Sequence, residues 1–103
     1  MPRGGKTKSR DEPERRCIAT GEVQPKRGLI TPAEVRAIAL AELDLGHAST
    51  MWDVGAGSGS VSIEAAMISS SGTVYAIEMD AEDHQLIIAN AERFGVRNVV
   101  PIL

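Results

Sequence analysis

The sequence TMWDVGAGSGS, residues 50–60, predicts the fold of this chain. A short apolar strand over residues 51–54 runs into a turn with glycine at positions 55, 57 and 59, and a helix follows from about Ser60. Glycine lets the backbone turn sharply and approach a ligand without an intervening Cβ. The loop amides and the start of the next helix offer hydrogen-bond donors and partial positive charge. We therefore expect a cradle for a nucleotide-type cofactor.

A second run, TVYAIE at residues 73–78, ends in an acid nineteen residues beyond Gly59. Its β-branched and aromatic side chains predict a second strand. An acid at the tip of that strand is placed to accept hydrogen bonds from both ribose hydroxyls of a cofactor. The dinucleotide pattern G-x-G-x-x-G needs glycine at position 60, where this chain has Ser60. An oxidoreductase half-domain is therefore disfavoured.

Length and composition limit the chain to one small domain. It has 103 residues, of which 43% are apolar and only three are aromatic, so its core must rest on aliphatic side chains. The single cysteine, Cys17, can form no internal disulfide and has no second thiol for a zinc ribbon, so we expect no metal and a cytoplasmic location. We also expect no membrane span, because no apolar run is long enough.

Charge divides the chain unevenly. Residues 1–30 carry a net charge of +4 and residues 31–103 a net charge of −7. Residues 1–14 combine Gly, Pro, Ser and charge, which predicts a disordered basic tail, and residues 15–30 show no sustained period, which predicts an irregular segment. Basic arms often contact nucleic acid, so RNA binding by this tail is the alternative function.

A helix is expected from Thr31, where Thr31-Pro32-Ala33-Glu34 is a capping box with proline at the first helical position. The apolar spacing to about Leu43 predicts two faces for it. The face toward the core would carry Val35, Ile38, Ala39 and Leu43, and the outer face Glu34, Arg36 and Glu42.

The rest of residues 31–103 reads as alternating strands and helices. Residues 51–54 are apolar enough for a central strand of a parallel sheet, and the helix after the loop should end near Ser69. Asp80 should cap a further helix that Gly95 closes. A third strand over residues 99–103 should lie at an edge, because Pro101 cannot donate to a ladder.

Several segments resemble a known family. The pattern D-x-G-x-G-x-G at residues 53–59 is similar to motif I of class I S-adenosylmethionine-dependent methyltransferases. From residue 28 onward, the chain resembles the decarboxylating precorrin-6B C5,15-methyltransferases of cobalamin synthesis. The resemblance is carried by GLIT (28–31), EVR (34–36), WDVGAGSGSVSIE (52–64), AIE (76–78) and NAERFGVRN (90–98). One departure is Pro32-Ala33, where the family often has a basic residue.

The resemblance implies S-adenosylmethionine as cofactor and a tetrapyrrole as substrate. Its cofactor-binding residues would be Asp53, Gly55, Ala56, Gly57, Ser58 and Gly59 around the methionine moiety, Glu78 at the ribose and Met79 beside the adenine. No catalytic residue is identified: His47 is expected in a loop, His84 on a helix surface, and Glu64 at a solvated helix position. For Asp53, a purely local role at the strand end is the alternative to cofactor binding.

Full class I methyltransferases are similar in having seven strands, so the resemblance implies a truncated Rossmann-like α/β half-domain with a parallel sheet of about three strands and flanking helices. An exposed sheet edge would then invite a second copy or a completing chain. Whether this chain alone is an enzyme stays open. Residues 15–30, in which R-x-C-x-x-T-G is followed by a short polar stretch and Leu29-Ile30, also resemble the start of the YlxR-like (DUF448) family, whose members are classed with RNA-binding proteins. A fusion near residues 28–30 or a chance likeness would both explain this.

Overall fold

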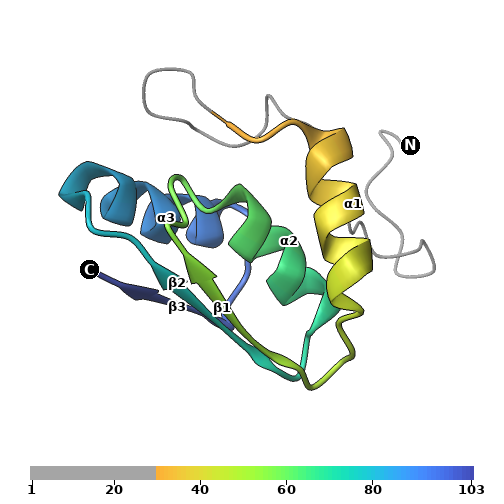
Figure 1. The fold of residues 1–103 in the computed structure, drawn as a ribbon. Helices are drawn as coiled ribbons and strands as arrows, with labels where there is room; N and C mark the ends of the chain where they lie inside the picture. The colour runs from red at the N-terminus through yellow and green to blue at the C-terminus, as the bar shows by residue number, and fades with distance from the viewer. Residues whose placement is uncertain (1–29) are drawn as a thin grey trace, which may run out of the picture.

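The structure, a computed structural model, describes residues 30–103, in which helices and strands alternate (Figure 1). The elements are α1 (Ala33–Leu43), β1 (Thr50–Val54), α2 (Ser60–Ile68), β2 (Thr73–Ile77), α3 (Ala81–Arg93) and β3 (Val99–Ile102). The expected tail over residues 1–14, the irregular segment up to residue 29 and Cys17 lie outside the described residues.

The three strands form one parallel sheet in the order β1-β2-β3, as the α/β reading predicted. Tyr75 pairs with Trp52 on one side and with Val100 on the other. The strand with two neighbours is therefore β2, and the expectation of a central β1 is wrong for the described sheet. An apolar sequence shows that a strand is suited to a parallel sheet, but it does not show whether the strand has one neighbour or two. The other edge is β3, as predicted, and its Pro101 pairs with Ala76 of β2.

The helices α2 and α3 cover one face of the sheet (Figure 1). Beneath them lies a buried core of aliphatic side chains: Ile63, Ala65, Ala66, Val74, Ala76 and Ile87. On the opposite face, which no element of residues 30–103 covers, Trp52 is 68% exposed and Val54 77% exposed. Because side chains alternate along a strand, each strand has one row of side chains in this core and one row outside it.

The helix α1 packs against α2, and its orientation differs from the prediction. Arg36 and Leu40 face inward and are buried, whereas Val35, Ile38 and Leu43 are each more than half exposed. The N-cap is Pro32 in an extended conformation with no side-chain cap, so the expected capping box does not form. Arg36 faces inward because its charge is paired across the helix interface, and the apolar spacing of α1 alone gives no sign of this.

Connecting segments are fixed by specific side chains. Asp80 accepts a hydrogen bond from the Asp83 amide at 2.9 Å and so caps α3, as predicted. Gly95 follows that helix with φ +67°, which glycine adopts readily. The Asn98 side chain donates to the carbonyls of Ala66 at 3.1 Å and Ser69 at 2.8 Å, which closes the C-terminal end of α2.

None of the helices in residues 30–103 has both the length and the apolar character to span a membrane.

Candidate cofactor site

The glycine loop between β1 and α2 depends on left-handed backbone conformations. Gly55, Gly57 and Gly59 have φ values of +78°, +60° and +95°, which other residues adopt only with strain. A Cβ built on Gly55 or Gly57 meets no atom within 4 Å, so open space lies beside both. A Cβ on Gly59 would stand 3.3 Å from Ile87 Cγ1, so this glycine lets α3 approach the loop. The first two glycines leave room for a ligand, and the third serves packing.

Backbone and side-chain hydrogen bonds hold the loop in this shape. The amides of Gly55 and Ala56 both donate to the carbonyl of Ile77, at 2.8 and 3.0 Å. Asn90 of α3, which is 1% exposed, donates from its side chain to the Ser58 carbonyl at 3.0 Å. Sequence reasoning gave Asn90 no role beyond the family pattern. A signal was present, because asparagine disfavours helix interiors and a buried one needs a hydrogen-bond partner.

Two carboxylates flank the loop at the carboxyl ends of neighbouring parallel strands. Asp53 in β1 accepts a hydrogen bond from the Ser62 hydroxyl at 2.6 Å. Glu78, directly after β2, accepts from the Gly57 amide at 2.8 Å with one oxygen and from the Asp80 amide at 2.9 Å with the other. Ligands of open α/β sheets bind outside this end of the strands. The two acids therefore lie at the strand ends, where the sequence placed them; Asp53 binds a side chain of α2, and Glu78 binds two backbone amides.

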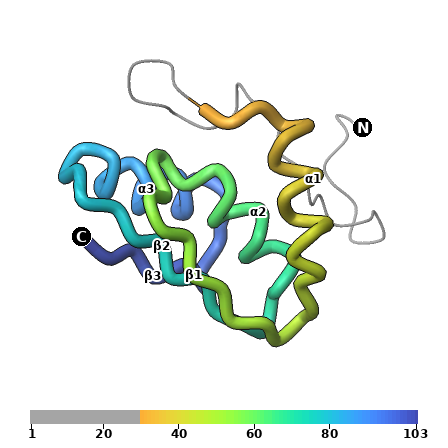
Figure 2. Tube along the Cα trace, viewed as in Figure 1, coloured from red at the N-terminus to blue at the C-terminus, as the bar shows by residue number. Residues whose placement is uncertain are grey.

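A groove of about 380 Å³ lies over the glycine loop. One wall is made by the backbone of residues 55–58 and by Ser60, and the other by Ile30, Thr31 and Pro32, the segment that leads into α1. Figure 2 shows this segment, in orange, passing above the loop. The volume falls within the range of small-molecule sites, which is about 300–1,000 Å³. The open space beside Gly55 and Gly57 is thus part of a formed groove.

The structure gathers only some of the predicted site residues in this groove. Gly55, Ala56, Gly57 and Ser58 line it, whereas Asp53, Gly59, Glu78 and Met79 do not. Met79 is 87% exposed. His47 lies in the turn before β1, beside Ser70 at 3.4 Å, and His84 lies half-buried on α3. Within residues 30–103, no group of three or more His, Cys, Asp and Glu residues could hold a metal ion.

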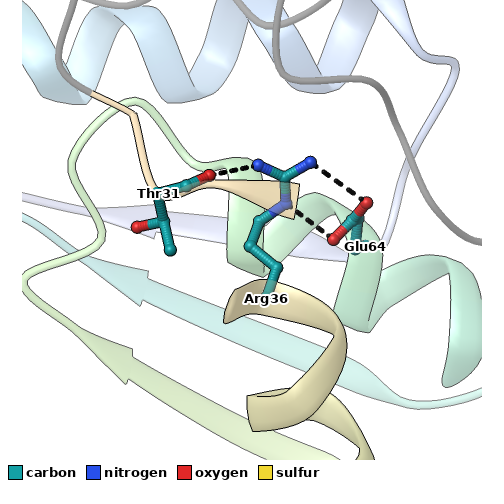
Figure 3. Close-up of polar contacts among 3 residues, drawn as sticks. All are labelled: Thr31, Arg36 and Glu64. Atoms are coloured by element: carbon teal, nitrogen blue, oxygen red, sulfur yellow. Dashed lines mark hydrogen bonds and ion pairs between the residues drawn. The ribbon is translucent and has the colours of Figure 1, made fainter. Parts of the chain in front are cut away.

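The expectation that Glu64 is solvated is wrong. Glu64 is 1% exposed and pairs with the equally buried Arg36, whose Nε lies 2.8 Å from Glu64 Oε1. Figure 3 shows the guanidinium between this carboxylate and the carbonyl of Thr31. Because the two residues are 28 positions apart, the spacing within either helix could not reveal the pair.

The parallel sheet, its helices and the glycine loop after β1 define the Rossmann-like fold of the class I S-adenosylmethionine-dependent methyltransferases. Solved structures of low identity share this fold. One of them, M. jannaschii TYW2 in complex with AdoMet, is 23% identical with a TM-score of 0.61, over 77% of this chain and 37% of that one. This likeness concerns the fold alone.

Closer relatives identify the family. The family model described as "Precorrin methyltransferase domain" matches residues 22–102, and the chain belongs to this family. The probable cobalt-precorrin-6B C(15)-methyltransferase (decarboxylating) of Pyrobaculum calidifontis is 47% identical over 75 residues, which cover 72% of this chain and 38% of the relative. The Salmonella typhimurium enzyme of this name is also 47% identical, over 68% of this chain and 36% of its own.

A solved structure gives the same result. The precorrin-6y C5,15-methyltransferase of Geobacter metallireducens superposes with a TM-score of 0.76 at 41% identity, over 81% of this chain and 44% of that one. The chain therefore spans less than half the length of these relatives and corresponds to the N-terminal half of the domain. The family match begins at residue 22, within the segment that was compared with RNA-binding proteins, and the comparisons give the RNA-binding alternative no support.

Proposed function

We propose that this chain is the S-adenosylmethionine-binding portion of a methyltransferase that acts on a precorrin in cobalamin biosynthesis. The observation that carries the proposal is the open groove over the left-handed Gly55 and Gly57, next to two acids at the ends of parallel strands. The membership of the precorrin methyltransferase family supports the substrate class. The expected cytoplasmic location belongs to the same proposal.

The residues present fit such a cofactor. Each ionised carboxylate has about four lone-pair sites, so Glu78 can accept from two ribose hydroxyls while it keeps the Gly57 and Asp80 amides. The groove wall at residues 55–58 would hold the methionine moiety, with Asp53 near the end of β1 before the loop and Met79 beside the adenine. Asp53 also fixes the first turn of α2 through Ser62, so it orients the loop from below.

The bound cofactor would supply a methyl group that its own sulfonium activates. The chain then has to bind the cofactor, orient it and keep water from the groove. The wall formed by Ile30, Thr31 and Pro32 contributes to the last task, because it covers the loop from the side of α1. No proton transfer is assigned to a residue of this chain.

Methyl transfer itself is proposed to need more surface than residues 30–103 provide. The chain covers 38% of the Pyrobaculum relative, and one face of its sheet carries exposed Trp52 and Val54. A further chain segment or a second copy of this chain packed on that face would bury these side chains and extend the site toward the tetrapyrrole.

The test is calorimetric titration of the chain with S-adenosylhomocysteine, the demethylated form of the cofactor. Gly57→Val places a branched side chain in the groove at φ +60° and should abolish binding while the circular dichroism spectrum persists. Gly46→Ala is the matched control, because its Cβ would meet only Ser49 Oγ at 3.7 Å. Saturable binding lost in Gly57→Val alone supports the proposal. A folded wild-type chain that binds no ligand would refute it.

A further inference from the structure

The buried pair of Arg36 and Glu64 joins the first helix of the described chain to the second. Arg36 Nε donates to Glu64 Oε1 at 2.8 Å, and Nη2 lies 3.5 Å from Oε2. Neither residue is more than 1% exposed. A buried ion pair recovers the cost of its desolvation only partly, and apolar residues of similar volume often stabilise a protein as well or better. Holding α1 on α2 therefore does not by itself account for a charged pair.

Arg36 has a further contact that an apolar residue could not make. Its Nη1 donates to the carbonyl oxygen of Thr31, which lies outside the helix (Figure 3). The guanidinium is a planar group with donors in a fixed fork, so the carboxylate on one side sets where the remaining donor points on the other. Glu64 thus orients Arg36, and Arg36 fixes the backbone at Thr31.

Thr31 lies in the wall of the groove over the glycine loop. The wall consists of Ile30, Thr31 and Pro32, and residues 55–58 with Ser60 face it. The expected capping box is absent at this position, so no side-chain cap fixes the entry into α1. The contact from Arg36 to the Thr31 carbonyl ties the wall to α2, the helix that follows the glycine loop.

We infer that Arg36 and Glu64 are positioning residues for the cofactor. They hold the wall formed by residues 30–32 in place above the glycine loop. The inference rests on the proposed function. Neither residue touches the ligand, and their effect on affinity passes through the wall. If loss of the contact leaves the wall in place for about a tenth of the time, the apparent Kd rises about tenfold.

The experiment separates positioning from stability with two kinds of variant. The double variant Arg36→Met with Glu64→Leu replaces the pair by apolar side chains that keep α1 docked, and it removes the donor to Thr31. Val74→Ala is the matched control: Val74 is fully buried in the core cluster on β2 and belongs neither to α1 nor to the lining of the groove. Kd for S-adenosylhomocysteine is measured by calorimetry, and the thermal midpoint by circular dichroism.

The pair variant and the core control should differ in which quantity changes, the affinity for the ligand or the thermal midpoint. We expect the apolar pair to bind about tenfold more weakly at little cost in Tm, and Val74→Ala to melt earlier with unchanged Kd. The charge swap Arg36→Glu with Glu64→Arg restores an ion pair but moves the guanidinium to α2, and it should also bind weakly. Wild-type Kd in any folded pair variant overturns the inference, as does a Kd that follows Tm across the series.

Hydrogen exchange of the wild-type chain makes the test independent of any variant. S-adenosylhomocysteine should protect the amides of residues 30–36 along with those of residues 55–60. Binding with protection of residues 55–60 alone overturns the inference and leaves the proposed function standing. A folded chain that binds no S-adenosylhomocysteine overturns both.

Discussion

Glu78 serves the loop and the proposed ligand at the same time. One of its oxygens accepts the Gly57 amide and the other the Asp80 amide, so the carboxylate joins the glycine loop to the start of α3. This arrangement fixes the orientation of both oxygens before any ligand arrives. A preorganised acceptor loses less entropy on binding than a mobile one. Removing its charge should therefore weaken ligand binding more than its partial exposure suggests.

We predict that Glu78→Gln weakens the binding of S-adenosylhomocysteine by about 10- to 100-fold, because hydrogen bonds to a charged group contribute about 1.5–3 kcal/mol. Calorimetry with S-adenosylhomocysteine and its 2′-deoxy form identifies the cause. The wild-type chain should discriminate between the two ligands, and Glu78→Gln should do so much less. Equal discrimination in both proteins would show that Glu78 does not contact the ribose.

Local pattern made some residues predictable and not others. The glycines, Asp53 and Glu78 were found because each sits at a fixed distance from a strand end, and the structure places both acids beside the loop. Glu64 and Arg36 were assigned to solvent, because the ion pair that buries them joins positions 28 residues apart. The roles proposed for Asp53, Glu78 and Met79 toward a ligand stay predictions.

Gly72, at the junction of α2 and β2, belongs to a connection that has no room for a side chain. A Cβ there would lie 1.9 Å from the Ser49 carbonyl oxygen and 2.9 Å from the Ala48 carbonyl carbon. Both neighbours are backbone atoms, and the Ser49 oxygen also accepts the Thr73 amide at 3.1 Å. The start of the β1 and β2 pairing therefore depends on this glycine.

We predict that Gly72→Ala lowers the free energy of unfolding by about 3 kcal/mol, because the backbone around Ser49 must shift to admit the methyl group. Urea denaturation followed by circular dichroism measures this. Gly46→Ala in the turn before β1 should stay close to wild type, since its nearest contact is ordinary. Equal urea midpoints for the two variants would contradict the steric account.

The ends of the helices and strands could largely be predicted from local sequence signals. Asp80 and Gly95 bound α3 as predicted, since capping and left-handed closure depend on neighbouring residues. The orientation of α1 could not be predicted from its apolar spacing, because the buried side carries Arg36 and Leu40 and the more apolar side is exposed. The place of β1 at the edge of the described sheet was also missed, since strand order depends on partners that local sequence does not specify.

The uncovered face of the sheet presents apolar side chains to solvent within the described residues. Register aligns Trp52, Tyr75 and Val100 in one row and Val54, Ile77 and Ile102 in the next. The ring centroids of the exposed Trp52 and the half-buried Tyr75 lie 5.8 Å apart, so the two rings adjoin between β1 and β2. Contiguous apolar surface of this kind drives association.

We predict that the chain self-associates with rising concentration and that Trp52→Arg shifts it toward the monomer in sedimentation velocity runs. Ile38→Arg is the matched control: it is 66% exposed, close to the 68% of Trp52, but lies on the outer side of α1. Trp52 emission should move to shorter wavelength as the wild-type chain associates. Association that both substitutions weaken equally would mean that the sheet face is not the contact.

The attachment of α1 has a consequence for how long a ligand stays. This helix packs on α2 through Leu40 and the Arg36 pair, and its outward side is exposed to water. Such an element can open without unfolding the sheet, because proteins open locally in cooperative units. Opening of α1 would carry the wall at Thr31 away and leave the glycine loop intact. The residence time of a bound cofactor would then be governed by the undocking of one helix.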